Sequence, residues 1–364
     1  MHSRYQLYQF ILKMLKRLDW SGRRETQATL GYLMTGIFLA QDVRLSEIAR
    51  KVPRGIKLEN IVQRMRRFLQ NERIDAQAIY APVIRSVLDE LRHTRLRVQI
   101  DRTLLNDRFN ILMLTLRWRG RALPITWRVL SHQGSSGYAE WQAILAELEA
   151  LLPPDAAVTI LGDREFGHPD MLDLIQQRGW DAYLRVKGDQ LIWDEASGEW
   201  SELRELGIEA GGETRCLQAT VFTKKHHYRA NFALTWDADE DEPLFIVTNQ
   251  PATPKTVWEF GHRFGCEPFF SDWKQRGFNL ENTRLIHTDR LERLLLPLAL
   301  LTVWVLGVAR RLKVSGGIHQ LLRPSRIAYF SCFQIGLRWL DHQFSNGRSL
   351  IPDNRYRFWQ LVPK

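Results

Sequence analysis

Hydrophobic positions along this chain change their spacing near residue 95. Over residues 5–92 they recur every three or four residues, which predicts helices. Polar and apolar residues then alternate as in β-strands over Arg95–Ile100, Ile111–Trp118 and Ala122–Leu130. Beyond these runs the pattern predicts a helix, a strand, a helix and a strand, over Tyr138–Leu152, Ala157–Leu161, residues 168–178 and Asp181–Val186.

The order of these elements predicts a central mixed sheet. Three strands joined by hairpins, followed by two helix–strand units, give an α/β sheet flanked by helices, with the first and fourth strands parallel. This is the element order of the ribonuclease-H-like fold. Residues 189–243 interrupt it with short β-type runs and an acidic stretch at 237–242, so we predict a β-rich insertion. The sheet resumes at Leu244–Asn249, and residues 291–364 have helical spacing.

Charge is distributed unevenly over the 364 residues, whose net charge is +10. Residues 1–100 hold 19 Lys and Arg against 9 Asp and Glu, and residues 246–364 hold 17 against 8. Residues 191–245 are acidic, with 5 against 12. Two basic regions around an acidic insertion favour a nucleic-acid partner over charge that serves only solubility.

A helix-turn-helix element is expected in the N-terminal region. Helical spacing from Leu45 is followed by a turn with Pro53 and Gly55, and then by a second helix over Leu58–Leu69. That second helix carries the basic residues Arg64, Arg66 and Arg67, and Lys57 lies at its start. We predict that these four residues contact DNA, although many helical bundles also have a basic surface.

Two aspartates follow strands that should be neighbours. Asp101 ends the first predicted strand and Asp163 ends the fourth, so a parallel pair would place them side by side. Glu267 lies on a later helix that can pack over the same edge. Three converging carboxylates repel one another unless a cation binds them. Oxygen ligands favour Mg²⁺ or Mn²⁺, and two such ions about 4 Å apart would support phosphodiester cleavage.

The helix that carries Glu267 has other chemically informative residues. Arg263 lies one turn before Glu267, Phe260 about two turns before it, and Lys274 about two turns after it. One face therefore presents an aromatic ring, a guanidinium, a carboxylate and an ammonium group. This suits a site where metal ions and DNA phosphates meet, and the alternative for the window alone is a solvated ion pair. Other acids fit the site less well, namely Asp107, Glu165, Asp170, Glu259 and Asp272.

Together these residues resemble the DDE transposases of bacterial insertion sequences, in particular the insertion sequence 4 family. That family carries a tyrosine–arginine–glutamate–lysine signature, and Phe260-x2-Arg263-x3-Glu267-x6-Lys274 keeps all three spacers. The surroundings of the two aspartates, Gln-Ile-Asp101-Arg-Thr and Leu-Gly-Asp163-Arg-Glu-Phe, are also similar. The β-rich insertion between the second and third acids is a further match.

The resemblance implies specific roles for these positions. Asp101, Asp163 and Glu267 would be the catalytic metal ligands, and Arg263 and Lys274 would contact DNA phosphates. The aromatic residue at position 260 and a tryptophan of the insertion, one of Trp193, Trp200 and Trp236, would hold a base flipped from the duplex during hairpin formation. Two departures affect the hairpin route: Phe260 lacks the tyrosine hydroxyl, and Pro268 predicts a kink after Glu267.

Several other functions and locations are not indicated. The sequence has no Walker or Rossmann loop, so no nucleotide cofactor is expected. Three widely spaced cysteines predict reduced thiols in a bacterial cytoplasm. The apolar run Leu294–Ala309 contains Pro297 and is shorter than a membrane span, so we predict a buried helix and no membrane.

We therefore predict a DNA transposase that cuts and pastes an insertion sequence, with Mg²⁺ or Mn²⁺ as cofactor. It would act on double-stranded terminal inverted repeats and target DNA, and as a homodimer in the DNA complex. Two alternatives remain: a ribonuclease-H-fold nuclease without strand transfer, and an inactive DNA-binding relic. The predicted boundaries are a helical DNA-binding domain at 1–94, a core at 95–188 and 244–290, an insertion at 189–243 and a helical region at 291–364.

Overall fold

Five helices form the N-terminal region of the computed structural model, which describes residues 4–18, 20, 23–53, 55, 57–118, 120–195, 197–327, 329–352 and 359. These helices are α1 (Arg4–Leu15), α2 (Arg24–Ala40), α3 (Leu45–Lys51), α4 (Leu58–Gln70) and α5 (Ala76–Glu90). Each buries an apolar stripe, as α4 does with Ile61, Met65 and Phe68. The predicted helix, turn and helix are therefore present as α3 and α4, and part of the turn lies outside the described residues.

The central sheet begins with three antiparallel strands and continues with two parallel ones. Its first five strands are β1 (Leu96–Leu105), β2 (Phe109–Trp118), β3 (Arg121–Leu130), β4 (Val158–Gly162) and β5 (Asp181–Val186). β1 pairs antiparallel with β2 and parallel with β4, and β4 pairs parallel with β5. Two helices connect these strands, α6 (Tyr138–Leu151) and α7 (Pro169–Gln176). The predicted mixed sheet and its parallel first–fourth pair are confirmed.

The β-rich segment extends the same sheet. It contains β6 (Leu191–Asp194), β7 (Glu199–Glu202), the turn η1 (Leu203–Leu206), β8 (Arg215–Phe222) and β9 (Tyr228–Thr235), followed by β10 (Leu244–Thr248). β10 pairs antiparallel with both β5 and β9, which gives the order β3-β2-β1-β4-β5-β10-β9-β8-β6-β7. These strands thus continue the sheet beyond β10.

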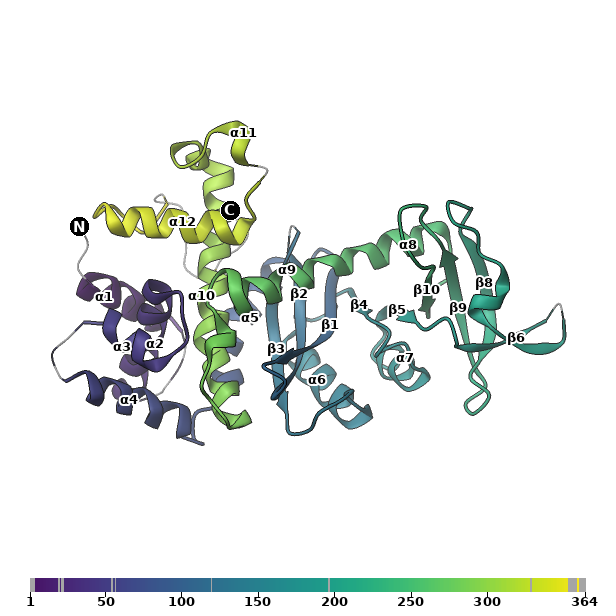
Figure 1. Ribbon diagram of the computed structural model, residues 1–364, viewed down its shortest axis with the longest axis horizontal. Coiled ribbons are helices and arrows are strands. Elements are labelled where there is room, and N and C mark those ends of the chain that lie inside the picture. Colours follow the sequence, from purple (N-terminus) through teal and green to yellow (C-terminus); the bar gives the residue numbers. More distant parts are fainter. Residues whose placement is uncertain are drawn as a thin grey trace.

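A segmented helical path crosses the sheet from β10 towards β1 (Figure 1). It consists of α8 (Pro254–Gly261), η2 (His262–Gly265), α9 (Cys266–Ser271), η3 (Asp272–Arg276) and η4 (Leu280–Asn282). Here α8 packs on β5, β9 and β10, whereas α9 packs on β1 and β3. The path therefore brings residues late in the chain onto the strands that carry the first two acids.

The longest helix, α10 (Thr288–Ser315), stands between the N-terminal helices and the first strands of the sheet (Figure 1). It is long and apolar enough to cross a membrane, but 94% of its most apolar window is buried inside the protein. The predicted buried helix is therefore confirmed. The chain continues through η5 (Gly317–Gln320), α11 (Pro324–Ile327) and α12 (Cys332–Ser345), and α12 packs on α10.

Gly336 of α12 marks the closest approach of that helix to α10. A Cβ at this position would lie 2.2 Å from the carbonyl oxygen of Val305, which is buried backbone and cannot move away easily. We expect Gly336→Ala to lower the free energy of unfolding by about 1–3 kcal/mol, measured by urea denaturation. Gly261→Ala is the matched control, because nothing lies within 4 Å of its added Cβ. Equal effects of the two changes would contradict this packing.

Candidate active site

Asp101 and Asp163 meet where the parallel pairing of β1 and β4 ends. The last paired residues are Ile100 and Gly162. The residues that follow them, Asp101 and Asp163, therefore carry their carboxylates at the same level of the sheet. Gly162 permits this approach, since a Cβ there would lie 3.0 Å from the side chain of Ile100. We predicted that Asp101 ends its strand, but β1 continues past it as the partner of β2. The two acids are neighbours because only the pairing with β4 ends there.

Glu267 lies on the segment that changes helical type along its length. We predicted one helical face with a kink at Pro268, and this single helix is not present. The 3-10 turn η2 comes before Pro268, and Pro268 lies in the first turn of α9. Proline is tolerated there because first-turn N–H groups have no partner within the helix. Arg263 and Glu267 nevertheless remain four residues apart on neighbouring turns.

The guanidinium of Arg263 lies among all three carboxylates. Its Nη2 is 3.4 Å from Oδ2 of Asp101 and 3.4 Å from Oδ2 of Asp163. Its Nη1 is 3.9 Å from Oε1 of Glu267. These contacts are longer than the roughly 2.8 Å of a tight charge-assisted hydrogen bond. The buried Nε of Arg263 has no hydrogen-bond partner in the described part of the chain. One cation is therefore shared by three acids, and none of them holds it tightly.

Buried contacts to the sheet fix η2 and hence Arg263. The amide of Gln99, on β1, donates to the carbonyl of His262 at 2.7 Å and accepts from Thr115 Oγ1 at 3.1 Å. Gly265 lies so close to β3 that a Cβ there would be 3.3 Å from the Arg121 carbonyl oxygen. The 3-10 turn is therefore held against three strands, which aims the arginine at their edge.

Burial and charge act in opposite directions on Asp101. Burial raises the pKa of this carboxyl, while the charge of Arg263 and a backbone hydrogen bond from Arg102 lower it. The net pKa shift is upward, so the arginine does not fully offset the loss of water around the carboxylate. A further cation at this position would favour the charged form of Asp101.

Lys274 lines the same cleft as Asp101 and Glu267. The cleft has a volume of about 410 Å³ and is lined by Asp101, Arg263, Glu267 and Lys274 among others. Lys274 Nζ donates to the carbonyl of Leu104 at 2.7 Å, and burial lowers the pKa of this ammonium group. The predicted site residues Asp101, Arg263, Glu267 and Lys274 are thus brought together in a cleft that is open to solvent.

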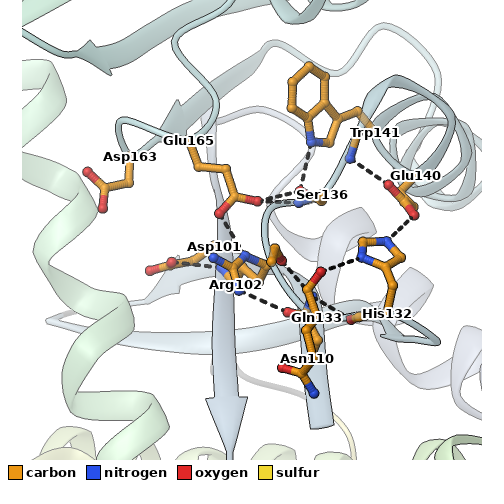
Figure 2. Close-up of polar contacts among 12 residues, drawn as sticks. Asp101, Arg102, Asn110, His132, Gln133, Ser136, Glu140, Trp141, Asp163 and Glu165 are labelled. Atoms are coloured by element: carbon orange, nitrogen blue, oxygen red, sulfur yellow. Dashed lines mark hydrogen bonds and ion pairs between the residues drawn. The ribbon is translucent and has the colours of Figure 1, made fainter. Parts of the chain in front are cut away.

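A polar network joins the segments that carry the first two acids (Figure 2). Glu165 accepts hydrogen bonds from Arg102 Nε at 2.7 Å and from the amide and hydroxyl of Ser136 at 2.8 and 2.6 Å. Arg102 also donates to Asn110, on β2, at 3.1 Å. In the view of Figure 2, Asp101 and Asp163 project to one side of this network.

Sequence reasoning set Glu165 aside because it lies past the end of β4. The signal that could have identified its partner was the Asp-Arg dipeptide at 101–102, which places a cation beside the first acid. The ion pair between Arg102 and Glu165 holds the Asp101 and Asp163 segments together.

Phe260, predicted to stack on a flipped base, is buried. Only 1% of it is exposed, so in this conformation the ring offers no face to a base. Phe264, four residues later, is 60% exposed. Phe260 and Phe264 line one cavity of about 570 Å³ together with Trp236 and Arg263. The other candidate tryptophans, Trp193 and Trp200, lie on β6 and β7 with their rings 5.8 Å apart.

The predicted DNA contacts on α4 differ in their surroundings. Arg64 turns inward, donating to Thr29 Oγ1 at 2.8 Å with its guanidinium 5.3 Å from the ring centre of Tyr32. Part of its hydrogen-bonding capacity is therefore used within the protein. Lys57, Arg66 and Arg67 are exposed. The structure thus leaves these three available to a partner.

The donor chemistry of the site fits a hard cation such as Mg²⁺ or Mn²⁺, because the three acids offer only oxygen. The spacing of the acids in this structure, however, is wider than that of a set of metal ligands. The described residues contain no group of three or more His, Cys, Asp or Glu side chains gathered closely enough to hold a metal ion. Instead, the shared guanidinium of Arg263 lies between the carboxylates. The arrangement is that of an acidic site whose negative charge is partly balanced by an internal cation.

Asp272, a rival acid by sequence, points away from this site. It is buried next to Arg121, whose Nε is 3.4 Å from its Oδ2. Burial raises its pKa from 3.8 to about 6, while Arg121 and Arg276 act in the opposite direction. Glu259 likewise pairs with Arg97 at 2.8 Å. Both acids therefore have structural partners outside the cleft.

The raised pKa of Asp272 predicts a pH dependence of stability. The folded protein binds this proton more tightly than the unfolded chain, so the stabilising contribution is complete below about pH 4 and is lost as pH rises through about 6. We expect Asp272→Asn to lack this loss, in urea unfolding across that pH range. The exposed Asp341→Asn serves as the control. The same pH slope in wild type and Asp272→Asn would contradict the assignment.

Comparison with known proteins identifies the family. Residues 106–304, more than half of the chain, match the family described as Transposase DDE domain. This match contains Asp163 and Glu267 and begins after Asp101. No curated protein matches the chain.

Among solved structures, the chain is similar to the piggyBac transposase in a cryo-EM structure of its synaptic complex with hairpin DNA. The identity is 10% over 94% of this chain and 83% of that one, with a TM-score of 0.39, which is too low to carry an argument. The family match is independent of this likeness. The chain belongs to the transposase DDE domain family.

Proposed function

We propose that this transposase moves an insertion sequence by a cut-and-paste mechanism and is a member of the insertion sequence 4 family with a variant of its signature, in which Phe260 replaces tyrosine. The observation that carries the proposal is the convergence of three carboxylates, from β1, the end of β4 and α9, on Arg263. The reaction would hydrolyse a phosphodiester at each terminal inverted repeat. The freed 3′-hydroxyl would then attack target DNA.

Asp101, Asp163 and Glu267 would hold the divalent cations, two ions of Mg²⁺ or Mn²⁺. When bound, such ions activate a water or a 3′-hydroxyl and stabilise the leaving oxygen. The chain's own contribution is to hold the acids in place. The Arg102–Glu165 pair fixes the first two acids relative to each other, and the contact of Gln99 with His262 fixes the approach of the third.

Arg263 acts as the counter-charge of the acids when neither metal nor DNA is bound. Three carboxylates around one guanidinium leave a net negative charge, which favours the arrival of further cations. With the acids neutralised by cations, the guanidinium would be free to bind a DNA phosphate, where its planar fork can bind two oxygens. Lys274, in the same cleft, would contact a neighbouring phosphate as a point charge.

The order of the first five strands supports a ribonuclease-H-like core. We propose that the β-rich insertion spans 189–243 and that the helical DNA-binding domain and the C-terminal helical region have the boundaries 1–94 and 291–364. β6 to β9 lie between β5 and β10 along the chain and at the far side of β10 in the sheet, as an insertion would. We place the protein in the bacterial cytoplasm and expect a homodimer on two DNA ends.

The cavity beside Arg263 supports a pocket for a flipped base. Trp236 and Phe264 line it, and Phe264 is exposed where Phe260 is not. We propose that these two rings, in place of Phe260, stack on the base if excision passes through a hairpin. Stacking on aromatic rings offsets part of the few kcal/mol that base extrusion costs.

Cleavage of a labelled duplex that carries the element's own end tests the proposed function. We expect Mg²⁺-dependent nicking at the end by the wild type, and at least a hundredfold less with Asp163→Ala or Glu267→Ala, since even outer-shell changes at metal sites cost about 10–100-fold. Asp272→Asn is the matched control and should cleave as the wild type does.

Joined products with target DNA would separate a transposase from a nuclease. Binding without cleavage by the wild type would indicate an inactive relic. Cleavage that survives both acid substitutions would show that other residues bind the metal.

A further inference from the structure

A second site, basic where the first is acidic, lies between the N-terminal helices and the start of α10. It is a cavity of about 380 Å³ lined on one side by α3 and α4 and on the other by residues 283–290. Four arginines line it, Arg44, Arg66, Arg284 and Arg290, which we call the arginine groove. The described residues that line the cavity include no Asp or Glu, and Asp42, outside the lining, pairs with Arg44 alone among the four. The guanidinium groups that Asp42 does not balance repel one another unless an anion binds there.

The arginines of the groove differ in how their charges are balanced. Arg44 is paired with Asp42 at 2.7 Å. The side chains of Arg66 and Arg284 are exposed, and within the described part of the chain neither has an ion pair or a side-chain hydrogen bond. They come from opposite walls, one from α4 and the other from the segment before α10. Their guanidinium groups are therefore available to a ligand that touches both walls.

The groove is preformed, because contacts beneath it join the two walls. Asn282 Nδ2 donates to Oδ2 of Asp42 at 2.9 Å, and Asn279 Nδ2 donates to the carbonyl of Gln41 at 2.7 Å. Between the walls the lining is apolar, with Leu45 and Leu294 among its residues. The groove thus has apolar and charged lining residues, between walls that these two hydrogen bonds tie together.

Its position favours a polyanion over a small anion. Glu281 lines the cleft of the catalytic acids and Thr283 lines the arginine groove, so the two sites are two residues apart along the chain. That spacing is at most about 7 Å between Cα atoms. A DNA duplex carries phosphates at close intervals along both strands and can contact both sites at once.

We propose that the arginine groove binds the phosphate backbone of the same DNA end whose cleavage site lies at the three acids. This rests on the proposed function and extends it. The sequence already predicted that Arg66, on α4, contacts DNA. Arg284, on the segment before α10, would add a second phosphate contact from the opposite wall. The groove would hold the duplex across the junction between the N-terminal helices and the catalytic core, which sets the distance from the bound backbone to the scissile bond.

The test is the salt dependence of binding. Fluorescence anisotropy with the labelled element end would give the slope of log affinity against log salt for the wild type and for Arg66→Ala/Arg284→Ala. Each phosphate contact contributes about 0.9 to that slope, so we expect the double variant to lose about two units. Arg66→Lys/Arg284→Lys keeps both charges and should keep the slope.

Lys224→Ala/Lys225→Ala is the matched control, because it removes two positive charges in the turn between β8 and β9, far from α4 (Figure 1). An unchanged slope in Arg66→Ala/Arg284→Ala would contradict DNA binding by the arginine groove, and the proposed function would be unaffected. A loss of equal size in the control would also contradict DNA binding by the groove. A wild type that does not bind the element end would contradict both proposals.

Discussion

The attraction of three acids to one buried guanidinium organises the centre of this protein. Asp101, Asp163 and Glu267 come from three distant parts of the chain, and each faces Arg263. Without that charge, the carboxylates would repel one another at an edge that is partly removed from water. The guanidinium therefore makes the converged arrangement possible in the absence of other ligands. Its contacts with the acids, at 3.4–3.9 Å, are longer than those of a tight ion pair, so each carboxylate keeps the capacity to bind another cation.

Other features of the fold serve this convergence. The parallel pairing of β1 with β4 ends one residue before each aspartate, and Gly162 lets the strands approach. The ion pair of Arg102 with Glu165 keeps their loops together, while Gln99 ties η2 to the sheet. These hydrogen bonds are partly buried and directional, so they restrict the distance between the acids.

The elements that depend on the local alternation of polar and apolar residues could be predicted from the sequence. Strand alternation located β5 and nearly located β2, β3 and β10, and the parallel first–fourth pair followed from element order. What it could not give depends on tertiary contacts. Helical spacing suggested one continuous face around Glu267, but packing of Gly265 against β3 tightens the chain into a 3-10 turn. Spacing also could not show that Phe260 is buried, that Arg64 turns inward, or that Glu165 joins two loops.

The most direct test of the central claim is to locate Mn²⁺ by anomalous diffraction in crystals of the protein with its element end. We expect Mn²⁺ bonded to the carboxylates of Asp101 and Asp163, with the guanidinium of Arg263 moved from between them to a DNA phosphate. Mn²⁺ bound elsewhere, with Arg263 still between the two aspartates in the DNA complex, would contradict it.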